Sequence, residues 1–121
     1  MDDQHRKEAG AAAEAAALKY LLLQGLKLIA RNYRCRAGEI DLVMLDGPAL
    51  ALIEVRYRTG DAFGGAAASV TYRKQRRIIT AARHLLMTRA DLHRYPARFD
   101  VIAVTPGMKM EWIRAAFTTD R

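Results

Sequence analysis

Apolar positions near the start of the chain recur at the three- to four-residue spacing of one face of an α-helix. Residues 7–24 are mostly strong helix formers, and Gly25 follows them at a place that suits a helix C-cap. We therefore predict a first helix over residues 7–24. Its stripe of apolar positions consists of Ala11, Ala15, Leu18 and Leu22.

Short apolar runs after this helix have the length and composition of β-strands. The first three runs cover residues 26–34, 39–45 and 49–57. Asp46-Gly47-Pro48 separates the last two runs, so the pattern predicts a meander of three strands. A fourth strand is predicted over residues 98–105, and residues 111–117 add a short terminal strand or a turn of helix.

A second helical stripe is predicted within residues 70–88, and its arginines lie mostly off the apolar face. The preceding residues 58–69 contain three glycines and form a connection long enough to be functional, for example as a substrate lid. The order of strands and helices predicts an α/β domain. The apolar stripe of the second helix consists of Ile78, Ile79, Ala82, Leu85 and Leu86.

The composition indicates one domain over residues 1–121, with residues 1–6 as a flexible N-terminal end. Glu14 and Lys19 interrupt the longest apolar stretch, so no transmembrane helix is expected. The polar, acidic start does not resemble a secretory signal, and a cytoplasmic location is expected. The single cysteine, Cys35, cannot form an internal disulfide, and no spacing of cysteine and histidine suggests zinc.

The net charge of +7 and the preference for arginine, in fifteen of twenty basic residues, favour a polyanionic partner such as nucleic acid. Two groups of cations are candidates for phosphate contacts, and a solvated face is the alternative for both. Tyr33, beside the first group, could stack on a base or simply pack. The groups are Arg31, Arg34 and Arg36, and then Arg73, Lys74, Arg76 and Arg77.

Four charged residues fall on the second and third predicted strands in a pattern that brings them together. Alternation places Glu39 and Asp41 on one face of their strand, and Glu54 and Arg56 on one face of the next. If the hairpin turns at the Gly47-Pro48 bond, paired residue numbers add to 95, and Asp41 faces Glu54 while Glu39 faces Arg56. A loop with an odd number of residues would instead send Asp41 and Glu54 to opposite faces.

Two carboxylates that face each other repel unless a cation lies between them. Mg²⁺ would compensate the charge of Asp41 and Glu54, and it suits hydrolysis of a phosphodiester because it activates water and stabilises negative charge. The alternative is structural: Arg56 neutralises Glu39 or Glu54 in an ordinary ion pair.

Four pieces of sequence follow a helix carrying Glu14, and they are Gly38-Glu39-Ile40-Asp41-Leu42, Ile53-Glu54-Val55-Arg56, Arg73-Lys74-Gln75-Arg76-Arg77 and Phe99-Asp100-Val101-Ile102. In this order they resemble the YraN-like family of bacterial proteins. The family is described as endonucleases, similar in fold to archaeal Holliday-junction resolvases and to restriction-type nucleases of the PD-(D/E)xK class. The resemblance spans roughly residues 6–117, and the ordered set of pieces is more specific than any one of them.

The resemblance implies a restriction-endonuclease-like three-layer fold, in which a central mixed β-sheet is flanked by helices. It also implies that Asp41 and Glu54 bind Mg²⁺ or Mn²⁺ and that Glu14 is a third acidic residue of the site. The position two after Glu54 is normally lysine in this class, whereas this chain has Arg56, which can act electrostatically but not as a base. The resemblance places Gln75 at the site as well.

Lys74 borders the apolar stripe of the second helix, so it could lean into the acidic site in place of the missing lysine or extend into solvent. Asp100 could support the site from the fourth strand or have an edge-strand or capping role. Trp112 is predicted to anchor the core.

These features lead to the hypothesis of a metal-dependent endonuclease acting on DNA, with branched or otherwise structured DNA as the substrate. The alternative is a nucleic-acid-binding protein that kept the scaffold and lost catalysis when lysine became arginine. A protein-binding adaptor is a third hypothesis, and it would show no steep salt dependence with DNA. The expected partners are nucleic acid, from the basic charge, and, by analogy with resolvases, a second copy of the chain in a homodimer.

Overall fold

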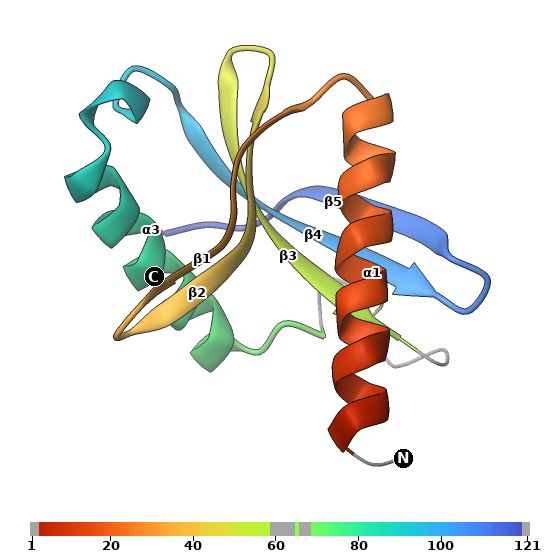
Figure 1. Cartoon of the computed structure of the whole chain (residues 1–121). Helices are drawn as coiled ribbons and strands as arrows, with labels where there is room; N and C mark the ends of the chain where they lie inside the picture. The colour runs from red at the N-terminus through yellow and green to blue at the C-terminus, as the bar shows by residue number, and fades with distance from the viewer. Residues whose placement is uncertain (1–2, 59–64, 66–68, 120–121) are drawn as a thin grey trace.

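The computed structural model describes residues 3–58, 65 and 69–119, with side chains from residue 8 onward. Five strands form one sheet in the order β1-β2-β3-β4-β5; β3 and β4 are parallel and all other neighbours are antiparallel. Helices α1 and α3 lie on opposite sides of this twisted sheet (Figure 1). The mixed sheet between two helices confirms the predicted three-layer α/β fold. The elements are α1 (Asp3–Leu23), β1 (Lys27–Cys35), β2 (Gly38–Asp46), β3 (Ala49–Tyr57), α3 (Tyr72–Thr88), η1 (Ala90–Leu92), β4 (Ala97–Thr105) and β5 (Lys109–Phe117).

Helix α1 differs from the prediction in its start and in the face that it buries. It begins at Asp3, so the backbone of residues 3–6, expected as part of a flexible end, is helical. Its buried residues are Ala13, Ala17 and Leu21, whereas three of the four positions in the predicted stripe are exposed. Alanine occurs on every side of this helix, so spacing alone could not identify the face.

The end of α1 agrees with the prediction. Gly25 has a φ of +97°, in the left-handed region that glycine adopts most readily. The Leu26 N–H donates to the Leu21 carbonyl at 3.1 Å, and the Gly25 N–H donates to the Leu22 carbonyl at 3.0 Å. These bonds satisfy carbonyls that would otherwise be left free at the helix end.

Helix α3 starts two residues after the predicted start and buries the predicted stripe except for Leu86, which is half-buried. Thr71 caps its first turn, because the Thr71 hydroxyl accepts the Lys74 N–H at 3.2 Å. The helix packs mainly against β2 and β1, and α1 packs against β3 and β4. Among the described residues, no helix is long and apolar enough to cross a membrane.

The β2–β3 hairpin has the register predicted for a turn at Gly47-Pro48. Its ladder runs from Asp46 opposite Ala49 to Leu42 opposite Ile53, pairs whose residue numbers add to 95. Residues 109–117 form strand β5, which decides between the two predicted alternatives in favour of a strand. The predicted lid falls mostly on residues 59–64 and 66–68, which lie outside the described part of the chain.

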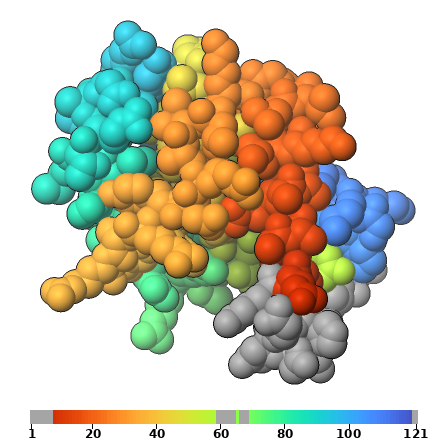
Figure 2. Space-filling model, in the orientation of Figure 1, coloured from red at the N-terminus to blue at the C-terminus, as the bar shows by residue number. Residues whose placement is uncertain are grey.

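The regular alternation of side chains along β2 is interrupted near Asp41. Ile40 packs in the core beneath α3, whereas Leu42, two residues later, packs in the core beneath α1. The β1–β2 hairpin lies between the two helices in this view, and its tip projects from the surface beside α3 (Figure 2). The half-buried Asp41 thus lies at the bend of a strand rather than in its regular part.

Candidate active site

Asp41 lies just beyond the last ladder pair of β2 and β3. Its Oδ2 accepts the backbone N–H of Val55 at 2.8 Å, so the side chain joins the two strands where their regular ladder ends. Asp41 and Glu54 are the next pair in this register, and their carboxyl groups share a hydrogen bond. The predicted meeting of the two acids is therefore present in the structure. Glu39 was expected opposite Arg56, but its carboxylate pairs with Arg34 at 3.1 Å.

Glu54 lies deep in this site, with 3% of its side chain exposed. The Lys74 ammonium is 2.9 Å from Glu54 Oε2, and Arg56 Nη1 is 3.8 Å from the same oxygen. Lysine therefore makes the close contact, although it comes from α3 rather than from the strand of Glu54. Of the two structural alternatives for Arg56, the ion pair with Glu54 is present at 3.8 Å, whereas Glu39 pairs with Arg34 instead.

The pKa of Asp41 is raised from 3.8 to about 7. Burial is the largest cause, followed by the negative charge of Glu54; the hydrogen bond with Glu54 and the charge of Glu39 add to the increase. The hydrogen bond from the Val55 N–H opposes it. Near neutral pH this carboxyl group is thus only partly ionised unless a cation compensates its charge.

The two acids open into a pocket of about 390 Å³ between α1, the β1–β2 hairpin and α3. Glu14 reaches it from α1, where its Oε1 accepts the Asn32 amide at 2.9 Å and pairs with Arg31 at 3.4 Å. Asn32 was not predicted, although its positive φ of 50° marks an unusual backbone position in β1. The residues lining the pocket are Gly10, Ala11, Glu14, Asn32, Arg34, Glu39, Asp41, Glu54, Val55 and Lys74.

Gln75 does not join this pocket. Its amide donates to the Val70 carbonyl at 3.0 Å, and it lines a separate hollow with Tyr72 and residues 115–118. Lys74 and Gln75 are consecutive on α3, and consecutive helix positions point about 100° apart. Of the two side chains that were expected to lean into the acidic site, the structure brings only Lys74 there.

The donor set suits a small hard cation held by two carboxylates. Within residues 8–58 and 69–119, no three acidic, histidine or cysteine side chains gather as a metal site, so Glu14 stands apart from Asp41 and Glu54. Mg²⁺ is commonly held by one or two carboxylates, with water and substrate oxygens completing its shell. Asp41 and Glu54 alone therefore fit such an ion, and burial of their shared negative charge favours it.

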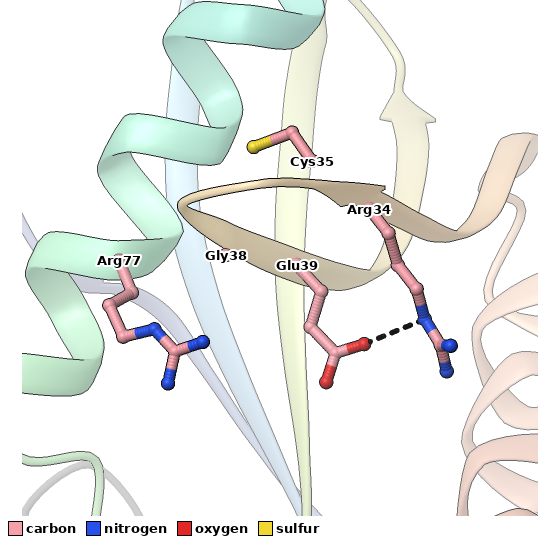
Figure 3. Close-up of a pocket in the computed structure, with 5 residues that line it drawn as sticks. All are labelled: Arg34, Cys35, Gly38, Glu39 and Arg77. Carbon is pink, nitrogen blue, oxygen red and sulfur yellow. Dashed lines mark hydrogen bonds and ion pairs between the residues drawn. The ribbon is translucent and has the colours of Figure 1, made fainter.

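A basic hollow of about 330 Å³ adjoins the acidic pocket and shares Arg34 and Glu39 with it. Figure 3 shows Glu39 projecting between Arg34 and Arg77, which come from the hairpin and from α3. Arg77 Nε donates to the Ala37 carbonyl at 3.3 Å. Cys35, a free and half-buried cysteine, lines the same hollow. The two candidate cation groups thus meet here.

The remaining predicted cations differ in exposure. Arg36 at the hairpin tip and Arg73 on α3 are exposed, whereas Arg76 is half-buried and has an interaction within the protein. Exposed arginines close to this hollow can reach phosphate without first breaking a buried contact.

Gly38 determines how closely the hairpin approaches α3, and the sequence analysis did not single it out. A Cβ at this position would lie 2.5 Å from the Arg77 carbonyl oxygen. Only glycine fits such an approach without a backbone shift. The contact holds the hairpin that carries Asp41 against the helix that carries Lys74.

Asp100 lies fully buried on β4, an internal strand of the sheet, and has no edge-strand role. Arg98 donates to both of its oxygens at 2.9–3.1 Å, and the Trp112 indole and the Ala115 N–H donate to it at 3.1 and 3.0 Å. Trp112 packs against the core beneath α1, as predicted. Arg98 also donates to Asp46 of β2 at 2.7 Å, so this network ties β4 to both β5 and β2.

The five-stranded mixed sheet between two helices, with an acidic pocket where two strands separate, defines a three-layer α/β domain of the restriction-endonuclease-like type. The sequence model of the family UPF0102, which is described as an uncharacterised protein family, matches residues 13–104. The chain belongs to this family. That span includes the residues of the acidic pocket from Glu14 onward and all of α3. Membership confirms the YraN-like resemblance at the level of the family, without naming an activity.

Curated relatives match over almost the whole chain. A UPF0102 protein of Saccharophagus degradans is 53% identical over 111 residues, covering 92% of this chain and 93% of the relative. One from Cupriavidus taiwanensis is 53% identical over 117 residues, covering 95% and 86%. One from Pseudomonas savastanoi pv. phaseolicola is 47% identical over 121 residues, covering 97% and 98%.

Proposed function

We propose that this protein is a metal-dependent endonuclease that hydrolyses phosphodiester bonds of DNA. The observation that carries the proposal is the meeting of Asp41 and Glu54 in one pocket, with the pKa of Asp41 raised to about 7 and Lys74 at 2.9 Å from Glu54. Strongly shifted pKa values in a cleft, caused by burial and a like charge, are typical of catalytic sites.

Asp41 and Glu54 would hold Mg²⁺ or Mn²⁺. When bound, such an ion lowers the pKa of a bound water and neutralises charge on the phosphodiester. The Val55 N–H fixes the orientation of Asp41, and burial of Glu54 excludes water from competing for its oxygens. Glu14, anchored to Asn32 and Arg31, would form the α1 wall of the site rather than a ligand.

The arginines around the adjoining hollow would hold the DNA backbone. Arg34 and Arg77 line the hollow, with Arg36 and Arg73 exposed nearby on the same elements. Contacts of this type recognise phosphates rather than bases, so the shape of the DNA would select the substrate. Branched or otherwise structured DNA is the substrate class that we propose, with a homodimer as the form that would bind a symmetrical junction.

A binding protein without catalysis is the second candidate, and Arg56 is the observation that favours it. Arg56 stands on β3 two residues after Glu54, and its guanidinium is 3.8 Å from the carboxylate. It cannot act as a base, because arginine stays protonated in proteins. This candidate needs the arginines but not Asp41 or Glu54.

The test is cleavage of end-labelled four-way junction, flap, single-stranded and linear DNA with Mn²⁺ or Mg²⁺. The wild type is compared with the double variant Asp41→Asn, Glu54→Gln, and with Asp91→Asn, which alters an exposed carboxylate on η1. We expect metal-dependent cleavage by the wild type and by Asp91→Asn, and a loss of at least about 1000-fold in the double variant. Tight binding without cleavage under every condition would instead establish the binding protein.

A further inference from the structure

We propose that Lys74, delivered from α3, is the lysine that stabilises the reacting phosphate at the Asp41–Glu54 centre. This inference rests on the proposed nuclease function and names a residue that acts in it. Its starting observation is that two cations approach Glu54 Oε2, the Lys74 ammonium at 2.9 Å and Arg56 Nη1 at 3.8 Å.

The two cations are not equivalent. A distance of 2.9 Å is that of a charge-assisted hydrogen bond, whereas 3.8 Å is too long for a hydrogen bond. The ammonium is a compact charge with three donors, so it can keep one bond to Glu54 and direct another at a neighbouring oxygen. Glu54 is 3% exposed and Lys74 is 42% exposed, so the pair lies at the edge of the site, where the ammonium remains accessible to a substrate.

The backbone holds Lys74 in this position. The Lys74 N–H is bound by the hydroxyl of Thr71, which fixes the first turn of α3. Gly38 lies against the carbonyl of Arg77, which is one helical turn from Lys74 on α3. The absence of a side chain at Gly38 therefore lets the hairpin approach α3 close to Lys74. Because the capped first turn fixes the backbone from which the Lys74 side chain extends, little rearrangement of the protein is needed when a substrate binds.

Lys74 also lies between the acidic centre and the arginine-lined hollow. It lines the acidic pocket, and it lines a small adjoining hollow with Glu39, Arg77 and Ile78. A DNA strand whose backbone contacts Arg77 and whose reacting phosphate is at Asp41 and Glu54 would pass the ammonium. Arg56, on β3, is not among the residues that line either described hollow.

In the reaction, a water oxygen bonds to phosphorus while the ester P–O bond breaks. The water gives one proton to solvent, and the departing oxygen takes one from solvent. Lys74 stays protonated throughout and donates hydrogen bonds to the phosphate oxygens, on which negative charge grows. Its contribution is therefore greater in the transition state than in the bound substrate, so its loss should lower kcat rather than raise KM.

A structural role would give a different result. If Lys74 only neutralised Glu54, its removal would weaken the fold of the centre, and Mn²⁺ affinity and cleavage would fall together. In the proposed role the ammonium repels a metal ion at the same carboxylate. Its removal should then strengthen Mn²⁺ binding while it weakens cleavage.

The experiment compares Lys74→Met with Lys19→Met, which makes the same change at an exposed site on α1. We expect Lys74→Met to lower kcat at least about 100-fold and change KM less than about threefold. Calorimetry without DNA should show Mn²⁺ binding about three- to tenfold tighter. Lys19→Met should match the wild type in both measurements. The double variant Arg56→Lys, Lys74→Met returns an ammonium to the site and should recover at least about tenfold in kcat.

Three results would overturn the inference while the proposed function stands: unchanged kcat in Lys74→Met, a fall in Mn²⁺ affinity together with kcat, or no recovery in the double variant. Absence of cleavage by the wild type on every DNA would refute the proposed function, and the inference would fall with it. Cleavage by the wild-type protein therefore distinguishes failure of this inference from failure of the proposed function.

Discussion

Asp41 and Asp100 are acidic residues of the same sheet, but the protein surrounds them in opposite ways. Asp100 is completely buried and receives hydrogen bonds from Arg98, Trp112 and Ala115. Asp41 receives one backbone N–H and faces the negative charges of Glu54 and Glu39. The first carboxylate is satisfied by the fold, whereas the second is satisfied only when a proton or another cation joins it. The difference separates an acid that holds the structure from one that is available for chemistry.

Replacement of Asp100 should have the largest effect on stability. Asp100→Ala leaves the Trp112 indole and the Ala115 N–H without their acceptor and leaves Arg98 with Asp46 alone, at a cost of about 3–5 kcal/mol in the free energy of unfolding. Urea titration measures this cost. Asp91→Ala, at an exposed acid, should change the midpoint little. A loss as small as that of Asp91→Ala would remove Asp100 from its structural role.

Replacement of Asp41 should change stability in the opposite direction. Its folded pKa of about 7 lies above its ordinary value of 3.8, so the folded protein holds a proton that the unfolded chain has released between these pH values. The free energy of unfolding should therefore fall as the pH rises from about 4 to about 7, by about 1–3 kcal/mol from this group.

Asp41→Asn removes this dependence and keeps an oxygen for the Val55 N–H. The metal-free variant should be more stable than the wild type at pH 8 and similar to it at pH 4. Urea titrations with a chelator at both pH values measure the difference. Equal stability at pH 8 would contradict the unfavourable environment assigned to Asp41.

Gly38→Ala should have a smaller effect, and it tests whether the acidic centre depends on the contact between hairpin and helix. The added Cβ would meet the Arg77 carbonyl oxygen at 2.5 Å, so the hairpin must shift, at a cost of about 1–2 kcal/mol. Mn²⁺ affinity should fall as well. Gly10→Ala is the control for stability alone, because Gly10 lines the acidic pocket; an added Cβ there meets nothing within 4 Å, and glycine weakens a helix. Unchanged Mn²⁺ affinity in Gly38→Ala would show that the centre is independent of this contact.

The sequence was sufficient for those parts of the fold that depend on local periodicity. Strand alternation and a two-residue turn placed Asp41 beside Glu54, because both rules act over a few neighbouring residues. The buried face of α1 was mispredicted, since alanines surround the helix and give no contrast. The closeness of Gly38 to Arg77 depends on packing between distant segments, which no local pattern records.

The candidate site, like the fold, was predicted only where local sequence patterns determine it. The two acids were found on neighbouring strands, but the nearest cation to Glu54 comes from a helix twenty positions farther along the chain. Which of Lys74 and Gln75 points at the acids depends on how α3 is rotated about its own axis, and the sequence does not give that rotation. Spacing alone placed both at the border of the apolar stripe.

The parallel pairing of β3 with β4 also has a consequence for the order of folding. Leu50 pairs with Ala97, so these strands join only after the intervening chain has been made, whereas β1, β2 and β3 pair through short turns. During synthesis the meander can therefore form first, with the apolar strand β3 as an open sheet edge. Until β4 covers that edge, the nascent protein is most exposed to aggregation, so this docking step is where a chaperone would have its largest effect.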